Sequence, residues 1–236
     1  MLENKDEGDV LREGPYLAAL AASGATLTDM HAETHPSQPN YLALFSGDTQ
    51  GVRDDRCPLT FDGANLASEL SAAGYTFAGY SEDLPRPGYT GCTAGDYARK
   101  HSPWTDFSTV PAGANQPLSA MPSDYARLPT VSFVIPNLCH DMHDCSTAVG
   151  DAWLQTNLDG YAQWAQTHNS VLIVTFDEDS ATTTSNHIFT VLVGEHIRPG
   201  ATSAQPIDHF NLLATIEATF GLAPLTASGP ITGIYR

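Results

Sequence analysis

The chain of 236 residues, 42% hydrophobic and 9% aromatic, is long enough to bury one substantial core, and we expect a single domain over residues 1–236. Its formal net charge is −17, and only Lys5 and Lys100 are lysines. Nucleic acids and anionic membranes both need clustered positive charge, so this balance argues against either as a main partner. A phosphorylated ligand would have to be attracted by local groups, and a divalent metal ion would supply such local charge.

Apolar, β-rich segments alternate with helical ones along the chain. The patterns predict helices at 15–22, 65–73, 151–167 and 209–220, and strands at 25–30, 75–80, 130–135, 170–176 and 188–193. Continuous apolar strands separated by helices are typical of an α/β fold with a mostly parallel central sheet, covered by helices on both faces. Residues 83–128 lose this periodicity and are dense in Pro, Gly, Ser and Asn, so we expect an irregular lid there.

One polar segment, Thr34-His35-Pro36-Ser37-Gln38-Pro39-Asn40-Tyr41, lies between the first strand and an apolar run at 41–45. This context places Ser37 in the first turn of a buried helix. Unpaired backbone N–H groups and the helix dipole favour an anion such as phosphate at that point. Taken alone, the segment favours Ser37 as an ordinary helix N-cap, and the other polar groups of the chain reverse that balance.

Further polar side chains follow two other predicted strands. The strand at 170–176 leads into Asp177, Glu178 and Asp179, and the strand at 130–135 leads into a group at 137–144 that contains Asn, His and Asp. Ligands of open α/β sheets bind beyond the carboxyl ends of the strands. Carboxylates and imidazoles together suit a divalent cation, although any one such strand end is also typical of a turn or a cap.

The four cysteines contain no CxxC pair, which argues against zinc-ribbon or thioredoxin chemistry. Cys57 and Cys92 both lie in turn-rich segments and are predicted to form one disulfide, with Cys139–Cys145 as a short second one. Two disulfides imply an oxidising, secreted setting. No signal peptide and no stable membrane-inserting segment is recognisable, so we expect either a trimmed mature chain or an incomplete N-terminus.

An ordered set of short motifs resembles bacterial secreted acid phosphatases of the phosphoesterase (phospholipase C/acid phosphatase) family, in the alkaline phosphatase superfamily. The matching segments span nearly the whole chain: 3–5, 34–41 through 46–47, 97–104, 136–144, 176–178 and 207–209. The Ser-x-Pro-Asn segment is also similar to the nucleophile segment of nucleotide pyrophosphatases. Such an ordered set is more specific than any of its members. The resemblance implies an alkaline-phosphatase-like fold and hydrolysis of phosphomonoesters.

The resemblance also implies a role for each matching residue. Ser37 would be the nucleophile, forming a phosphoserine intermediate, and a metal bound to its hydroxyl would lower the pKa of that group. The metal ligands implied are Glu3, Asn4, Ser37, Asp177 and Glu178. His101 and Lys100, with Asn40 and His35, would contact the substrate. His143 would either contact the phosphate or act as the acid for the leaving oxygen. A second metal would be held by Asn137, Asp141 and His209, with His187 as a neighbour of the site.

One departure from the family pattern concerns the N-terminus. Family members carry an apolar strand before the Glu-Asn pair, whereas only Met1 and Leu2 precede Glu3 here. We therefore expect Glu3 and Asn4 to fray. Two alternatives to an acid phosphatase stay open: a phosphodiesterase of the phospholipase C type, and an inactive relative that binds a metal or a phosphorylated ligand without turnover.

Overall fold

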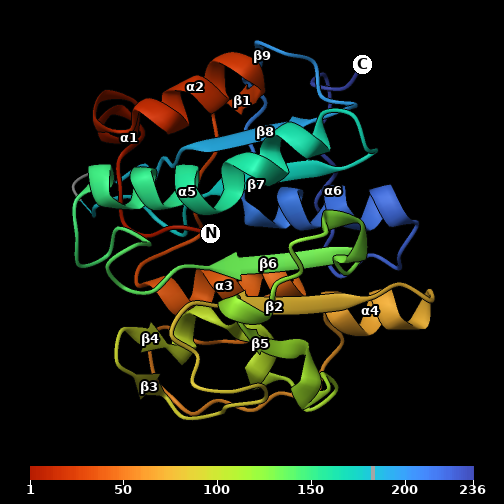
Figure 1. Ribbon diagram of the computed structural model, residues 1–236. Coiled ribbons are helices and arrows are strands. Elements are labelled where there is room, and N and C mark those ends of the chain that lie inside the picture. The colour runs from red at the N-terminus through yellow and green to blue at the C-terminus, as the bar shows by residue number, and fades with distance from the viewer. Residues whose placement is uncertain (182–183) are drawn as a thin grey trace. The chain divides into compact units, whose positions relative to one another are not determined.

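The computed structural model describes residues 1–181 and 184–236, which form two compact units (Figure 1). Unit 1 comprises Met1–Ala32, Cys139–Asp208 and Ile231–Arg236. Unit 2 comprises Glu33–Leu138 and His209–Pro230. In the part of the chain described, no helix is both long and apolar enough to cross a membrane.

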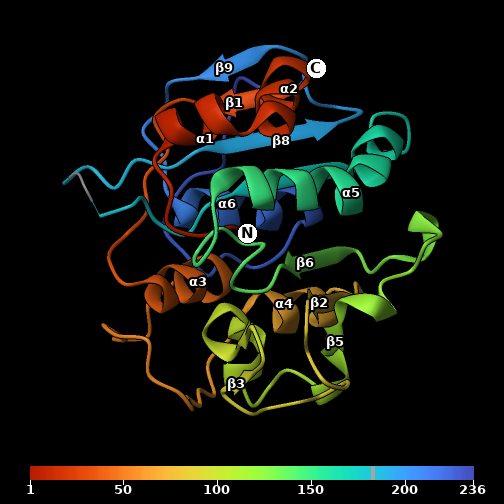
Figure 2. The same cartoon turned by 60° about the vertical axis from the view of Figure 1, so that its left-hand side comes forward.

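Unit 1 is built on a four-stranded sheet in the order β7-β8-β1-β9. Its strands are β1 (Ala25–Leu27), β7 (Val171–Thr175), β8 (Thr190–Gly194) and β9 (Ala201–Ser203). β8 runs antiparallel to both of its neighbours, with Ile173 opposite Leu192 in the β7 pairing, whereas β9 is parallel to β1. Figure 2 shows β9, β1 and β8 in this succession. Every residue of β8 is buried, which explains its continuous apolar sequence.

Three helices belong to unit 1: α1 (Glu7–Glu13), α2 (Pro15–Ser23) and α5 (Thr147–Ala165). α2 packs on β8, and α5 packs on β7 and β8. Pro15 suits the first turn of α2 because its missing N–H would have no helical partner there. The next N–H groups, of Tyr16 and Leu17, donate to the carboxylate of Asp151 in α5 at 3.0 and 2.8 Å. Asp151 therefore caps α2 from a neighbouring helix.

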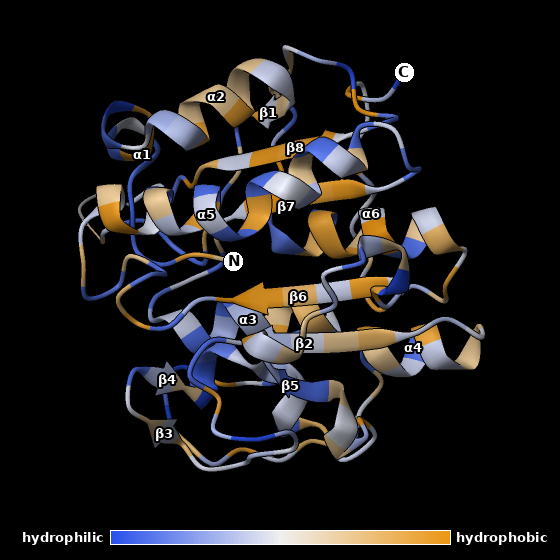
Figure 3. Ribbon diagram, viewed as in Figure 1, coloured by the Kyte–Doolittle hydropathy of each residue, from blue (hydrophilic) through white to orange (hydrophobic). Residues whose placement is uncertain are grey.

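Unit 2 contains a three-stranded, fully parallel sheet in the order β5-β2-β6. Its strands are β2 (Phe77–Ser81), β5 (Asn115–Pro117) and β6 (Val131–Ile135), with a separate hairpin of β3 (Thr93–Ala94) and β4 (Tyr97–Ala98). The α-helices are α3 (Ser37–Ser46), α4 (Leu66–Ala72) and α6 (His209–Phe220), and α6 packs on both α3 and α4. Figure 3 shows hydrophobic residues concentrated on β6 here, and on β7 and β8 in unit 1.

Aromatic side chains form much of the core of unit 2. Phe45 of α3 contacts the rings of Phe77, Phe107 and Phe133, with ring centroids 5.4 to 6.0 Å apart. Trp104 packs against Phe77 and Phe133, and its indole N–H donates to Asn115 Oδ1 at 2.8 Å. These tilted and edge-on arrangements are the favoured geometries for aromatic pairs. α3 is thus held rigidly in the core, and with it the residue at its start.

The α/β fold class is confirmed, and each predicted helix and strand is present with small shifts of its ends. The description of the sheet as mostly parallel holds for unit 2, whereas the sheet of unit 1 is mixed because of β8. Residues 83–128, expected to be irregular, contain β3, β4 and β5 and five 3-10 turns of three or four residues. One of these short strands, β5, even extends the parallel sheet. That the segment acts as a lid stays a prediction.

Both predicted disulfides are present, Cys57–Cys92 in unit 2 and Cys139–Cys145 in unit 1. Their cysteines are 35 and 6 residues apart in the sequence. In the chain-entropy model the longer loop stabilises more, by about 3–4 kcal/mol. Replacing Cys57 and Cys92 with serine is therefore expected to lower the free energy of unfolding by about that amount, and replacing the other pair by less. Urea denaturation of the two double variants checks this, and the reverse order would contradict it.

Candidate active site

Ser37 is the first residue of α3, and the N-cap position before it is occupied by Pro36. Ser37 is therefore not the N-cap, which removes the simpler of the two interpretations that its sequence allows. The side chain is buried, at 2% exposure, and lies in the turn where helical N–H groups have no helical acceptors. The next amide, that of Gln38, donates to Asp55 Oδ1 at 3.0 Å. The local field at the start of α3 thus favours negative charge.

The two predicted cationic contacts lie beside α3 in unit 2. Lys100 donates from Nζ to Asp55 Oδ2 at 2.7 Å, so one carboxylate bridges Lys100 and the first turn of α3. His101 is buried and stacks on the ring of Tyr41, with centroids 5.0 Å apart. Because Tyr41 follows Ser37 by four residues, both lie on the same face of the helix. Lys100 and His101 are therefore held beside the helix that begins with Ser37.

The two other predicted substrate contacts, His35 and Asn40, have different environments. His35 is exposed and precedes Pro36 through a cis peptide bond. Asn40 is fully buried in α3, and its side chain bonds to the backbone of Glu33 and Thr34.

The predicted metal ligands Glu3, Asn4, Asp177 and Glu178 come together in unit 1. Leu2 pairs with Phe176 in parallel, through Leu2 N–H to Thr175 O and Asp177 N–H to Leu2 O, each at 2.9 Å. Glu3–Asn4, which follow Leu2, and Asp177–Glu178, which follow Phe176, therefore lie side by side. Asn4 N–H donates to Asp177 Oδ1 at 3.1 Å, and Asn4 Nδ2 donates to Glu178 Oε1 at 2.9 Å.

The expected fraying of Glu3 and Asn4 was wrong. The parallel pairing of Leu2 replaces a longer strand, and Glu3 N–H donates to Asp141 O at 2.8 Å. Glu3 is fully buried as a result.

This group of residues fits a divalent cation. Glu3, Asp177 and Glu178 are buried carboxylates in the same unit, and buried charges are stable when they are paired or bind metal. Asn4 Oδ1 is also buried and has no hydrogen-bond partner among residues 1–181 and 184–236. An orphaned amide oxygen beside carboxylates is a suitable ligand for a hard cation.

The remaining predicted residues are distributed over both units. In unit 1, Asp141 Oδ1 accepts the N–H of His143 at 2.8 Å, and His143 Nδ1 lies 2.6 Å from Asp144 Oδ1. In unit 2, Asn137 Nδ2 donates to Asp83 Oδ2 at 2.8 Å. His209, at the start of α6, is fully buried and bonds through Nδ1 to Glu33 Oε2 at 2.7 Å. Asp141 belongs to unit 1, whereas Asn137 and His209 belong to unit 2, and a second metal at these residues stays a prediction.

Several polar residues around α3 were missed by sequence reasoning. Asp55, Glu33 and Asp106 each contact the nucleophile helix or the loop before it, but none belongs to a recognisable motif. Asp55 is a single acidic residue in a turn, and its role depends on a fold that brings Lys100 to it. Burial of Asp106 raises its pKa to about 6, although the Arg99 guanidinium, 2.9 Å away, opposes this rise.

The raised pKa of Asp106 predicts a pH-dependent stability. The protonated carboxyl is favoured in the folded state, so its contribution to stability is present below pH 4 and is lost as pH rises through about 6. Between these values the wild type is expected to lose about 3 kcal/mol relative to Asp106→Asn, which cannot ionise. Free energies of unfolding of both proteins from pH 4 to 7 check this. A constant difference across the range would contradict it.

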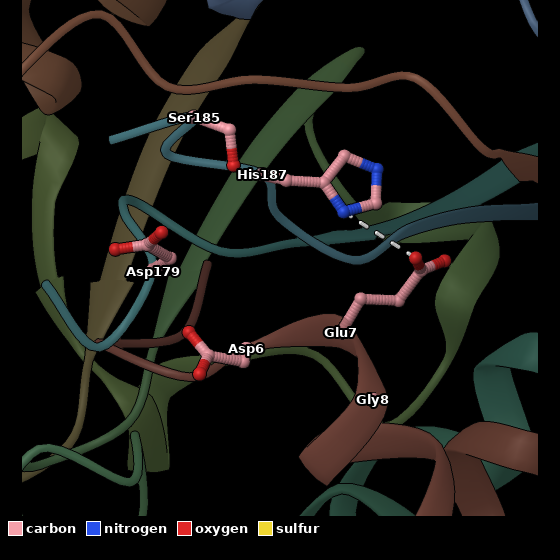
Figure 4. A pocket seen from close by; sticks show the side chains of 6 residues that line it. All are labelled: Asp6, Glu7, Gly8, Asp179, Ser185 and His187. Atoms are coloured by element: carbon pink, nitrogen blue, oxygen red, sulfur yellow. Dashed lines mark ion pairs between the residues drawn. The ribbon is translucent and has the colours of Figure 1, made fainter. Parts of the chain in front are cut away.

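Unit 1 also has a polar hollow of about 220 Å³, lined by Asp6, Glu7, Gly8, Asp179, Ser185 and His187 (Figure 4). His187 Nδ1 lies 3.4 Å from Glu7 Oε2, and burial raises the pKa of Glu7 while His187 opposes that rise. Asp6, another lining residue, accepts the Ser180 hydroxyl through Oδ1 at 2.9 Å. Asp6 and Asp179 follow the two pairs of predicted metal ligands in sequence, so the hollow adjoins that group.

Comparison with known proteins places this arrangement in a family. The model of the Phosphoesterase family matches residues 11–223. The chain is 50% identical over 242 residues to a phosphatidylinositol-3-phosphatase of Mycobacterium tuberculosis, covering 99% of this chain and 80% of the relative. It is 31% identical to an acid phosphatase of Aspergillus fumigatus, covering 95% of this chain but only 54% of that relative. The chain belongs to the Phosphoesterase family, a class of hydrolases that act on phosphoric ester bonds.

The fold also resembles that of solved structures. A Vibrio parahaemolyticus protein in the alkaline phosphatase superfamily superposes with a TM-score of 0.65 at 14% identity, covering 98% of this chain and 69% of that one. At this identity the likeness concerns the fold alone. The predicted Phosphoesterase family is confirmed, and the fold resembles that of this superfamily member.

Proposed function

We propose that the chain is a secreted, metal-dependent acid phosphatase that hydrolyses phosphomonoesters through a phosphoserine on Ser37. The observation that carries the metal-dependent part is the pairing of Leu2 with Phe176, which sets Glu3–Asn4 beside Asp177–Glu178 and leaves Asn4 Oδ1 without a partner in the described chain. Two disulfides support an oxidising, extracellular setting.

The residues divide the chemistry between them. Glu3, Asn4, Asp177 and Glu178 would hold a divalent cation, which when bound lowers the pKa of a hydroxyl ligand and neutralises phosphate charge. Ser37 Oγ attacks phosphorus, the ester oxygen leaves as an alcohol after receiving a proton, and water then hydrolyses the phosphoserine. His143 is proposed as the proton donor. Lys100 and His101 would bind the phosphoryl oxygens, a needed attraction in a chain of net charge −17.

The substrate is proposed to be a phosphomonoester, and a phosphorylated lipid headgroup is one form of it. The M. tuberculosis relative is a phosphatidylinositol-3-phosphatase, and the chain spans 80% of its length. The discriminating experiment measures hydrolysis of an aryl phosphate, an aryl phosphodiester and phosphatidylinositol 3-phosphate, each with and without a chelator.

Chelator-sensitive hydrolysis of the monoesters, with slow hydrolysis of the diester, is the expected result. Faster turnover of the diester would favour a phosphodiesterase of the phospholipase C type. No turnover of any substrate, in a protein that still binds metal, would favour an inactive binding relative. Undiminished hydrolysis in the presence of chelator would contradict metal dependence.

The proposed contact between His101 and the phosphoryl oxygens gives a separate prediction. His101→Ala removes the ring that stacks on Tyr41 beside the start of α3, so it is expected to lower kcat/KM for an aryl phosphate by at least about tenfold and to weaken inhibition by inorganic phosphate. His168→Ala is the matched control, because His168 also stacks on an aromatic ring, that of Trp164, but is exposed in unit 1, in the turn that follows α5. Normal kinetics in His101→Ala would remove it from the site.

A further inference from the structure

Asn40 lies three residues after Ser37 in α3, and its side chain has 0% exposure. Its Oδ1 accepts the backbone N–H groups of Glu33 and Thr34, both at 3.1 Å. Its Nδ2 donates to Thr34 O at 2.8 Å and lies 3.5 Å from Pro36 O. All four contacts are therefore with the backbone of the loop 33–36, which leads directly into Ser37.

These contacts use the hydrogen-bonding capacity of the amide. An asparagine side chain has two N–H donors and two acceptor lone pairs, and here both kinds of group are directed at the backbone. A phosphoryl oxygen could reach Nδ2 only if the contact to Pro36 O or the bond to Thr34 O were given up. Breaking a buried hydrogen bond of this kind costs about 1–3 kcal/mol. The geometry therefore argues against Asn40 as a phosphate ligand.

The other side of the same loop is also fixed. The Glu33 carboxylate accepts the His209 N–H at Oε1, 2.9 Å away, and contacts His209 Nδ1 at 2.7 Å through Oε2. His209 begins α6, which packs on α3. The loop before the nucleophile is thus held by Asn40 from within α3 and by His209 from α6.

We propose that Asn40 is a positioning residue for Ser37: it ties the loop 33–36 to the first turn of α3 and so sets the direction of Ser37 Oγ. The inference rests on the proposed function, since it assigns a task within the Ser37 reaction. Attack on phosphorus requires the oxygen to be aligned with the bond that breaks, and a misplacement of about 1 Å can cost roughly a hundredfold in rate. Loss of Asn40 should therefore lower kcat rather than phosphate affinity.

The test compares Asn40→Ala with Asn65→Ala. Asn65 is also 0% exposed and also bonds to its own local backbone, because its Oδ1 accepts Ser68 N–H at 3.0 Å at the start of α4. It lies outside the proposed site, so it controls for loss of a buried asparagine. Both variants are expected to lose stability. Only Asn40→Ala should lose kcat for an aryl phosphate, by about ten- to a hundredfold, with the inhibition constant of inorganic phosphate within about threefold of wild type, a change of under 1 kcal/mol.

Two results would overturn this assignment: an unchanged kcat in Asn40→Ala, or a rise in the phosphate inhibition constant with kcat retained, which would make Asn40 a phosphate ligand. If Asn40→Ala does not fold, Asn40→Asp preserves the shape and the acceptor oxygen but cannot donate to Thr34 O. Its kcat is then expected to fall about tenfold, and a wild-type kcat would overturn the assignment.

Ser37→Ala in the same series separates the two proposals. An active Ser37→Ala refutes the proposed mechanism and the positioning role with it. An inactive Ser37→Ala beside an unimpaired Asn40→Ala refutes the positioning role alone.

Discussion

Ser37→Ala is expected to abolish phosphatase turnover, lowering kcat by several orders of magnitude, because the proposed covalent intermediate cannot form without the hydroxyl. Folding should be nearly unaffected. Ser37 is the first helical residue rather than the N-cap, so the change in the free energy of unfolding should stay within about 1 kcal/mol. Steady-state kinetics and urea denaturation of the purified variant measure both quantities.

Ser46→Ala is the matched control, because Ser46 is a buried serine at the opposite end of the same helix. Its hydroxyl donates to Leu42 O at 2.8 Å, so its loss disturbs α3 without touching the proposed nucleophile. Activity in Ser46→Ala should be close to wild type. A Ser37→Ala variant that keeps more than about a tenth of the wild-type kcat, a barrier change under 1.4 kcal/mol, would show that another group attacks phosphorus.

The second large effect concerns the metal ligands. Asp177→Ala and Glu178→Ala are each expected to abolish activity and to lower the metal content of the protein, because each removes a buried carboxylate from the group around Asn4. Elemental analysis after dialysis measures the metal, and an aryl phosphate assay measures the activity. If the cation is lost, the remaining buried carboxylates lose its compensating positive charge, which lowers the stability of the protein.

The control for this pair is Asp151→Asn in the same unit. Asp151 is a buried carboxylate too, but it caps α2 by accepting the N–H groups of Tyr16 and Leu17. Its replacement should cost stability and leave metal content and kcat unchanged. A double variant at positions 177 and 178 that retains full metal occupancy would contradict the assignment of these ligands.

The helices and the buried strands could be predicted from the sequence because their signals are local. Pro15 and Gly24 bracket α2, and the apolar run at 170–176 marks β7. The direction of β8 could not be predicted, because an apolar strand reads the same whether its neighbours are parallel or antiparallel. α1 and β9 were missed, since seven and three residues carry little periodicity.

Only part of the site could be predicted, because some of its residues lie in local motifs and others are brought in by tertiary contacts. Ser37 and the pairs Glu3–Asn4 and Asp177–Glu178 belong to short motifs, and the structure places them at a helix start and at one strand end. The partners Asp55 and Glu33 act only through tertiary contacts to Lys100 and His209, which no local pattern encodes. The fraying expected at Glu3 was wrong because the pairing of Leu2 with Phe176 and the hydrogen bonds of Glu3 and Asn4 hold the segment in place.

The central claim is that phosphate is transferred to Ser37, and trapping the intermediate tests it most directly. The protein is mixed with an aryl phosphate, quenched in acid within its first turnover and digested, and the peptides are sequenced by mass spectrometry. The account predicts one phosphoryl group, on Ser37, that is absent from Ser37→Ala and absent when the metal has been removed beforehand. A phosphoryl group on a histidine or on another serine, or full turnover with no phosphopeptide at any quench time, would contradict it.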